Sequence, residues 1–267
     1  WRNHRITHHE LFVMTTSLRS TDIAWQAIFD RHNIHNHDFD ESPYEITSEQ
    51  IKEATRHFTI TGQREVRVLC KQDERDSRPL VFQENNLFIL PIRNGRYVIL
   101  RGEGYLDIPP IPETTDFYQP KLTFPLITSG IGDSEMQHLD FAYATSIVRS
   151  FMQDTSLVLT IRGRKYTPRF DFRVGSHRIT AESVQTEVDA GYEGESQVVL
   201  IEAKRPTSNT IIRQLYYPFR QWHHHVMVSG TDKAVSTVFF EKSGDGYSLW
   251  LFEFNDFHDY NSIQLVR

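Results

Sequence analysis

Four consecutive β-forming residues, Val198 to Ile201, constrain this chain more than any other stretch of its sequence. A run without a polar position predicts a strand that is buried on both faces of a sheet. The chain has 267 residues, of which 39% are apolar, so it is large enough to bury a sizeable core around such a strand. The same composition excludes a disordered, collagen-like or membrane-spanning chain.

The pattern around this strand predicts a sheet flanked by helices. Apolar residues recur at three- and four-residue steps over 133–153, which predicts an amphipathic helix capped by Asp133 or Ser134. A second helix is expected over 209–217, ending at Pro218. Strands are expected over 157–161, 170–174, 184–189, 198–203, 235–240 and 247–254. The predicted fold class is α/β (α+β), with a mixed central sheet.

The N-terminal residues predict helices followed by a β-hairpin. Segment 20–22 suits the start of a helix that ends near Arg31, and Thr47 with Gln50 has the spacing of a capping box. Strands are expected over 65–70, 87–92 and 97–100, the last two joined by a turn at Asn94-Gly95. This arrangement is compatible with a winged-helix-like module that recognises DNA, and equally with many small α+β folds.

Five prolines lie between residues 106 and 125, at positions 109, 110, 112, 120 and 125. Proline forbids a regular helix or a central strand there. The segment therefore predicts a stiff connection between an N-terminal module, 1–125, and a C-terminal domain, 126–267. An ordinary surface loop within a single domain is the alternative.

Charge and cysteine content limit the partners and the compartment. The net charge of −6 argues against a protein that coats nucleic acid indiscriminately, but is compatible with a local basic groove. Cys70 is the only cysteine, so no intrachain disulfide can form. The apolar runs are far shorter than the ~20 residues of a membrane helix, and the first residues lack the apolar core of a signal peptide. We therefore expect a cytoplasmic protein with no membrane partner.

The candidate site lies where the apolar strand ends. Glu202 and Lys204 are two residues apart, so a strand projects both side chains from one face. Strict alternation in the preceding strand puts Gln185, Glu187 and Asp189 on one face, and a hairpin through 191–194 brings Asp189 toward Glu202. Two carboxylates beside a lysine suit phosphodiester hydrolysis. Mg²⁺ takes oxygen ligands and keeps several waters, and the lysine can orient the attacking water.

These residues resemble a known motif. Asp189, thirteen positions before Glu202-Ala203-Lys204, is similar to the motif of the PD-(D/E)xK nuclease superfamily, and residues 130–255 are most similar to type II restriction endonucleases. Helix 133–153 resembles the helix before the core sheet, with Glu135 similar to an additional acid of some members. The segment 209–220 resembles the helix after the motif.

The resemblance implies a restriction-endonuclease-like core and a sequence-specific DNA endonuclease that leaves 5′-phosphate and 3′-hydroxyl ends. It implies Mg²⁺ as cofactor, with Mn²⁺ substituting. Asp189 and Glu202 would be the metal ligands, the Ala203 carbonyl a third ligand, and Lys204 the water-orienting group. The resemblance also implies a homodimer that acts on double-stranded DNA, because one active site cuts one strand and a double-strand break needs two.

One departure affects the first acid. Val188 stands where the family motif has proline. Glu187 and Glu193 are therefore rivals for the role of Asp189, and Asp171 is a more distant one. A bare Glu-x-Lys on a solvent-facing strand is usually a cross-strand charge pair.

Cationic and acidic residues form two adjacent blocks. Residues 162–178 carry six Lys or Arg against Asp171 alone, and 182–202 carry six acids without a Lys or Arg. Cations that grip phosphates beside carboxylates that hold a metal suit a nuclease; the alternative is that the blocks pair as salt bridges. The candidate DNA-binding residues are Arg162, Arg164, Lys165, Arg169, Arg173 and Arg213.

Two further hypotheses stay open at this point. One is a catalytically silent nucleic-acid-binding module with the same fold. The other is a nuclease for RNA or for branched DNA in repair. The run His35-Asn36-His37 predicts a polar loop, since three adjacent residues do not make an HNH nuclease motif, and His223-His224-His225 predicts the C-terminal end of a helix.

Overall fold

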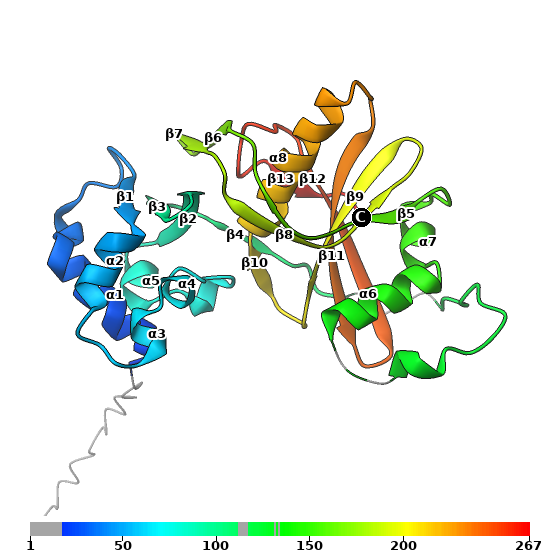
Figure 1. Cartoon of the computed structure of the whole chain (residues 1–267), viewed down its shortest axis with the longest axis horizontal. Helices are drawn as coiled ribbons and strands as arrows, with labels where there is room; N and C mark the ends of the chain where they lie inside the picture. The colour runs from blue at the N-terminus through cyan, green and yellow to red at the C-terminus, as the bar shows by residue number, and fades with distance from the viewer. Residues whose placement is uncertain (1–17, 112–116, 131, 133) are drawn as a thin grey trace, which may run out of the picture.

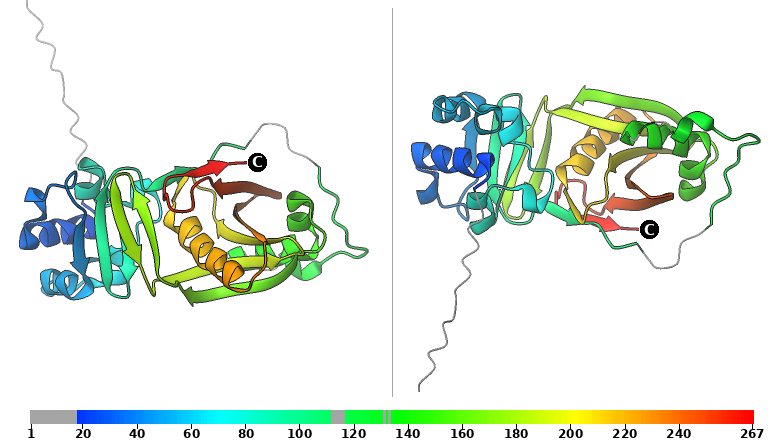
Figure 2. Two further views of the ribbon diagram at one scale, coloured as in Figure 1. Left: turned by 90° about the horizontal axis from the view of Figure 1, so that it is seen from above. Right: turned by 90° about the horizontal axis from the view of Figure 1, so that it is seen from below.

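A computed structural model describes residues 18–111, 117–130, 132 and 134–267. It shows a smaller N-terminal part, rich in short helices, beside a larger part built on a six-stranded mixed sheet (Figure 1). The two views of Figure 2 show these parts adjacent along the long axis of the molecule. The predicted fold class, a mixed central sheet with helices, is confirmed.

The N-terminal part packs its helices on an antiparallel sheet of order β1-β3-β2. Trp25 and Phe29 of α1 meet Phe82 of α5 edge to face, at ring-centroid distances of 4.7 and 5.6 Å from Phe82. Gly95, with φ +71°, makes the turn between β2 and β3 as predicted. The elements are α1 Ser20–His32, η1 Ile34–Asn36, β1 Tyr44–Thr47, α2 Ser48–Thr55, α3 Thr61–Arg64, α4 Val66–Leu69, η2 Arg75–Ser77, α5 Leu80–Glu84, β2 Leu87–Arg93 and β3 Arg96–Arg101.

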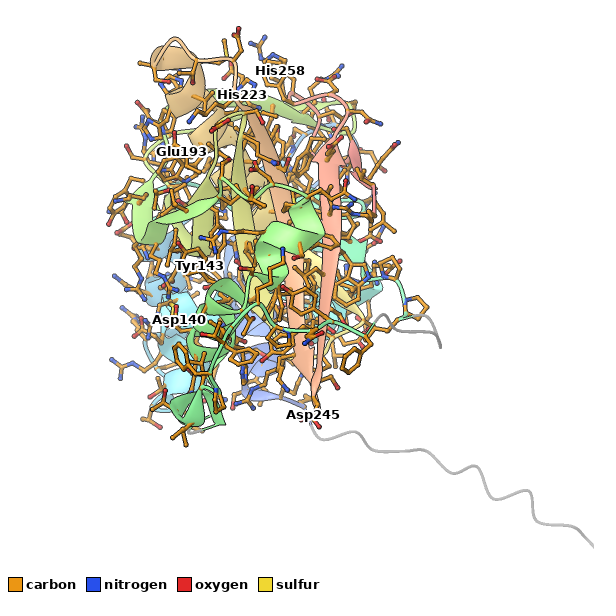
Figure 3. All side chains as sticks on the ribbon, turned by 90° about the vertical axis from the view of Figure 1, so that its right-hand side faces the viewer. Asp140, Tyr143, Glu193, His223, Asp245 and His258 are labelled. Atoms are coloured by element: carbon orange, nitrogen blue, oxygen red, sulfur yellow. The ribbon has the colours of Figure 1, made fainter. Side chains whose placement is uncertain are left out.

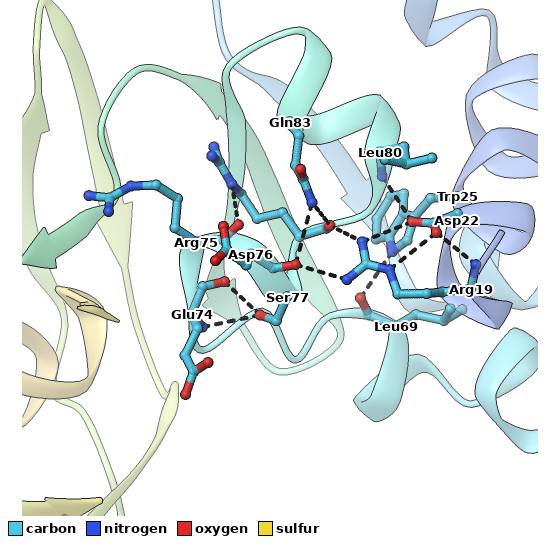
Figure 4. A network of polar contacts seen from close by, with 11 residues as sticks. Arg19, Asp22, Trp25, Leu69, Glu74, Arg75, Asp76, Ser77, Leu80 and Gln83 are labelled. Carbon is cyan, nitrogen blue, oxygen red and sulfur yellow. Dashed lines mark hydrogen bonds and ion pairs between the residues drawn. The ribbon is translucent and has the colours of Figure 1, made fainter. Parts of the chain in front are cut away.

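A polar network fixes the start of α1 (Figure 4). The residue before the helix is Arg19, and the Asp22 carboxylate accepts hydrogen bonds from the Arg19 backbone N–H at 2.8 Å and from the Leu80 N–H at 2.9 Å. The helix therefore starts within the predicted segment, with Asp22 in its first turn rather than at the cap. Trp25 donates its indole N–H to the Leu69 carbonyl at 2.9 Å, which joins α1 to α4.

The larger part is built on a sheet of order β13-β12-β11-β9-β8-β5. β9 and β11 run parallel and the other neighbours antiparallel, so the sheet is mixed. Short pairs β10-β4 and β6-β7 lie beside it. The elements are β4 Tyr105–Asp107, η3 Ile127–Gly130, α6 Glu135–Ala144, α7 Ile147–Met152, β5 Val158–Tyr166, β6 Phe170–Val174, β7 His177–Ala181, β8 Gln185–Glu193, β9 Gln197–Lys204, β10 Asn209–Ile211, α8 Arg213–Val228, β11 Ala234–Ser243, β12 Gly246–Phe254 and β13 Ile263–Leu265.

Helices cover both faces of β9, as its continuous apolar run predicts. Val199 and Ile201 pack in one cluster with side chains of α6 and α7. Val198 and Leu200 pack on the opposite face with Trp222 of α8. Because each face has its own apolar layer, β9 is buried along almost its whole length.

The two parts share an apolar core. One cluster joins Phe88 of β2 to Phe172 of β6 and Tyr216 of α8. The Tyr217 hydroxyl donates to the Pro91 carbonyl at 2.9 Å across the same boundary. The start of the proline-rich segment is also part of the folded structure, because its first residues lie in β4, which pairs with β10. Pro112 lies outside the described residues.

Three predicted elements are wrong. Within the strand predicted over 65–70, residues 66–69 form α4, since Val66 and Leu69 are buried at a helical spacing of three. The helix over 133–153 is two helices, α6 and α7, separated at Ser146, whose φ is +66°. Ser134 caps α6, and Asp133 lies outside the described residues.

The helix predicted over 209–217 is also different. Residues 209–211 form β10, and α8 runs from Arg213 through Pro218 to Val228. Proline removes one backbone hydrogen bond from a helix interior, at a cost of about 3 kcal/mol. Tyr216, Tyr217 and Phe219 are buried around Pro218, and this packing holds the helix intact.

Among the residues that the structure describes, none of the helices combines the length and the apolar character needed to cross a bilayer.

Candidate active site

The predicted acids and the lysine come from neighbouring strands. The ladder between β8 and β9 ends at the pair Ala190 and Ile201, so the next register position sets Asp189 opposite Glu202. The Ala203 backbone N–H donates a hydrogen bond of 2.8 Å to the Asp189 carboxylate. Asp189 is therefore tied to the strand that carries Glu202 and Lys204.

A bulge in β8 lies between Val188 and Gly191, where the predicted alternation of its side chains ends. Between the pairs Ile161–Gly191 and Gly163–Val188, β8 contains one residue more than β5. Val188 packs on the face covered by α8, whereas Ala190, two residues later, packs on the opposite face. Burial alternates from Gln185 to Asp189 as predicted, and the extra residue shifts the phase of the strand only from Ala190 onward.

Glu202 is a buried carboxyl group with a cationic neighbour. Its residue is 7% exposed, and its carboxylate lies 2.6 Å from the Lys204 ammonium. Burial raises the pKa of Glu202 to about 8, with Asp189 adding to the rise and Lys204 opposing it. Burial alone would lower the pKa of Lys204, yet the Glu202 carboxylate raises it above its ordinary value. Both side chains of this weakly hydrated pair therefore favour their protonated forms.

Asp189 belongs to the same electrostatic group. Burial raises its pKa, the hydrogen bond from Ala203 opposes the rise, and the charges of Glu135 and Glu187 add to it. Glu135 lies in the first turn of α6 and lines an open cleft together with Lys204. The structure therefore brings Glu135 to the site, as its position before the core sheet predicts.

The rivals of Asp189 have other partners. Glu193 pairs with Lys233 at 2.5 Å, and Asp171 pairs with Arg178 at 2.8 Å on the β6-β7 hairpin. Glu187 faces Arg164 across β5 and β8 at 3.4 Å. Of the candidate first acids, only Asp189 is hydrogen-bonded to β9 among the described residues.

The predicted DNA-binding residues are spread over the surface rather than gathered at the site. Arg162 pairs with Asp140 of α6, Arg164 with Glu187, and Arg173 with Asp256. Only the Arg164 pair joins the two charge blocks, so the blocks do not simply neutralise one another. Lys165 and Arg169 are exposed at the end of β5 and before β6.

Arg213, the last candidate DNA-binding residue, also has an acidic neighbour. It begins α8 at the boundary between the two parts, where its guanidinium lies 3.6 Å from the Asp73 carboxylate. The Asp73 carbonyl also accepts from the Ile211 N–H at 2.8 Å. Asp73 comes from the N-terminal part and acts electrostatically on Glu202 and Lys204. No sequence signal points to Asp73, because it is brought to the site only by the packing of the two parts.

The donor set suits a hard cation. No group of three or more His, Cys, Asp or Glu side chains with metal-binding geometry occurs among the residues described. Asp189 and Glu202 supply two carboxylates and Ala203 a carbonyl where the pairing of β8 with β9 ends. Mg²⁺ suits such a sparse all-oxygen set, since it usually keeps several of its waters.

The histidine runs lie elsewhere. His35 lies in the short 3-10 helix η1 rather than in the predicted polar loop, and His37, which follows η1, contacts the Ser42 carbonyl at 2.7 Å. His223 stacks on Phe257 at 5.2 Å, and Figure 3 shows it near His258, at the end of the molecule opposite Asp245. Burial lowers the pKa of His223, with Arg220 adding to the effect.

Comparison with known families divides the chain in two. A family model described as "Domain of unknown function (DUF6997)" matches residues 100–267, and another, "Domain of unknown function (DUF6996)", matches residues 22–99. The first match covers more than half of the chain. The chain belongs to the DUF6997 family. The whole candidate site lies within the DUF6997 match, apart from Asp73 in the DUF6996 match. No curated protein and no solved structure matches the chain.

Proposed function

We propose that this DUF6997 chain is a Mg²⁺-dependent endonuclease that hydrolyses phosphodiester bonds of double-stranded DNA in the manner of a type II restriction enzyme. The observation that supports this most is the 2.8 Å hydrogen bond from the Ala203 N–H to Asp189, which joins the first acid to the strand of Glu202 and Lys204. An acid pair with an adjacent lysine at a sheet margin suits phosphoryl chemistry.

The position of each residue suggests its role in the reaction. Asp189 and Glu202 would hold the cation, and Ala203 offers its carbonyl. When bound, Mg²⁺ would stabilise charge on phosphate oxygens and make water more acidic. Lys204 holds a proton beside Glu202 and can orient the attacking water by donating a hydrogen bond to its oxygen. A double-strand break needs two such sites, so we propose that two copies of the chain act together.

The experiment is direct. Duplex DNA of long, mixed sequence is incubated with the protein and Mg²⁺, and the products are resolved by length. We expect discrete fragments with wild type and none with Asp189→Asn or Lys204→Ala. Cleavage by Lys204→Ala at the wild-type rate would refute the assignment.

Parallel substrates separate the other hypotheses. Branched DNA, single-stranded RNA and linear duplex are compared under the same conditions, with Mn²⁺ as a second cation. Preferential cleavage of branched DNA or RNA would replace the restriction-type proposal. Binding to DNA without any metal effect or cleavage would identify a silent binding module instead.

A further inference from the structure

A cleft opens beside the candidate site, between α6 and the ends of β9 and β11. Its volume is about 470 Å³, within the range of small-molecule sites. Glu135, Lys204, Arg205, Phe240 and Lys242 are among the residues that line it. Phe240 is buried in the sheet, so the cleft presents mainly polar and charged side chains.

Sheet register brings two cations to this cleft from distant parts of the chain. β9 and β11 are parallel, and Lys204 pairs with Glu241. The next residue on each strand is cationic, Arg205 after Lys204 and Lys242 after Glu241. Neither the pairing nor the neighbourhood of Arg205 and Lys242 is visible in the sequence.

The two cations differ from several arginines near the site in having no acidic partner. Arg162, Arg164 and Arg173 are paired with carboxylates. Among the described residues, Arg205 and Lys242 form no ion pair, and the Lys242 ammonium lies 5.2 Å from the centre of the Tyr247 ring. Among the residues that the structure describes, Glu135 is the one carboxylate that lines the cleft. A chain of net charge −6 therefore carries a locally positive cleft next to its acid pair.

We propose that this cleft binds the phosphate groups of one nucleic-acid strand, with Arg205 and Lys242 as the phosphate-binding side chains. This inference rests on the proposed nuclease function for the identity of the strand. Cations that line a cleft without an acidic partner are available to bind an anion, and a phosphodiester running past Lys204 would place successive phosphates within their reach. The strand leaving the acid pair would thus be held through its backbone, without reading of its bases.

The test measures binding without catalysis. A short labelled single-stranded oligonucleotide is titrated with protein in EDTA at several salt concentrations, and fluorescence anisotropy gives the affinity. We expect Arg205→Gln and Lys242→Gln each to weaken binding about three- to tenfold, and each to reduce the slope of log affinity against log salt by about one. The effect is expected to be the same for different base sequences.

Lys233→Gln is the matched control. It removes the same charge just before β11, at the strand end opposite Lys242, where Lys233 pairs with Glu193. We expect wild-type affinity and salt slope from this variant. Affinities of Arg205→Gln and Lys242→Gln equal to that of the control would overturn the inference.

Two more outcomes are informative. Pyrophosphate or adenosine monophosphate that competes as well as the oligonucleotide, mole for mole, would overturn the assignment to a strand. The binding assay is independent of cleavage. Loss of binding in the two variants with no cleavage of any substrate in Mg²⁺ would refute the nuclease and leave the phosphate site supported.

Discussion

At the scale of single residues, the most unusual group is the Glu202 carboxyl. It is almost completely buried on a strand that needs to be apolar, and it is held there with Lys204 as its nearest cation. Burying a carboxylate is costly, and a single neighbouring charge recovers only part of the cost. Glu202 therefore lowers the stability of the metal-free fold above neutral pH, as expected of a residue kept for function.

The first prediction concerns pH. The folded pKa of Glu202, about 8, lies above its ordinary value of 4.5. The unfolded chain therefore releases this proton first, and the free energy of unfolding falls as pH rises from 4.5 to about 8. Glu202→Gln removes this loss, and we expect a stabilisation of about 1–3 kcal/mol at pH 8.5 that is absent at pH 4.5. Thermal unfolding at both pH values measures it.

Glu187→Gln is the control for this variant, since Glu187 is exposed on the neighbouring strand β8. We expect no pH-dependent gain from it. Added Mg²⁺ should stabilise wild type at pH 8.5 and leave Glu202→Gln unchanged, because a cation that binds only the folded chain adds to its stability. Equal Mg²⁺ effects in both proteins would contradict Glu202 as a ligand.

The second prediction concerns Asp22. Its carboxylate accepts from two backbone N–H groups, one at the start of α1 and one at Leu80 of α5. Although burial opposes it, the hydrogen bonds from Arg19 lower the pKa of Asp22. We expect Asp22→Ala to cost about 1–3 kcal/mol in chemical denaturation. Asp30→Ala, at the exposed end of the same helix, should cost less than half as much.

At the scale of elements, the bulge in β8 decides the geometry of the site. It lies between the part of the strand that packs under α8 and the part that packs under α6 and α7. Asp189 lies at this bulge, where the packing of the β8 side chains switches from one face of the sheet to the other. The extra residue shifts the side chains that follow Asp189, so Ala190 packs on the face opposite Val188.

Gly191 permits the close approach of β5 to this bulge. A Cβ at this position would lie 2.6 Å from the Ile161 Cβ, a branched atom that cannot rotate away. We expect Gly191→Ala to destabilise the fold by about 1–3 kcal/mol and to lower metal affinity, because the strands must move apart. Gly246→Ala is the control: its nearest contact is 3.4 Å and its φ is not positive. Unchanged Mg²⁺ affinity in Gly191→Ala would show that the bulge does not set the geometry of the metal site.

At the scale of the whole molecule, the two family matches correspond to parts that each have an apolar cluster of their own and are joined by a shared one. Phe88 of the N-terminal part and Phe172 of the C-terminal part belong to one apolar cluster. The boundary between the matches, 99/100, falls inside β3, N-terminal to the proline-rich segment. Splitting the chain at either place would expose this shared cluster to water.

Cooperative unfolding follows from the shared cluster. Phe172→Ala removes a ring that is 1% exposed, and we expect a loss of about 3–5 kcal/mol. Hydrogen exchange should show the loss in β2 and β3 as well as in β6 and α8, since both parts pack on the same ring. Increased exchange confined to the C-terminal part would show that the parts unfold independently.

The local elements were predictable where the signal is local. The turn at Asn94-Gly95, the buried strand after Gln197 and the hairpin at Gly244 follow from backbone preferences and apolar runs of a few residues. The strand predicted over 65–70 is wrong because a short apolar run fits a helix and a strand equally well. Burial of Val66 and Leu69, three residues apart, favours the helix.

The sequence by itself determined the central strand and the acid–lysine pair at its end, because Glu202 and Lys204 are two residues apart and a strand fixes their relation. Tertiary structure alone decided the rest of the site. The bulge beneath Asp189, the approach of Asp73 from the other part, and the meeting of Arg205 with Lys242 each depend on pairings between residues far apart in the chain. Register and packing set these distances, and they are properties of the folded chain as a whole.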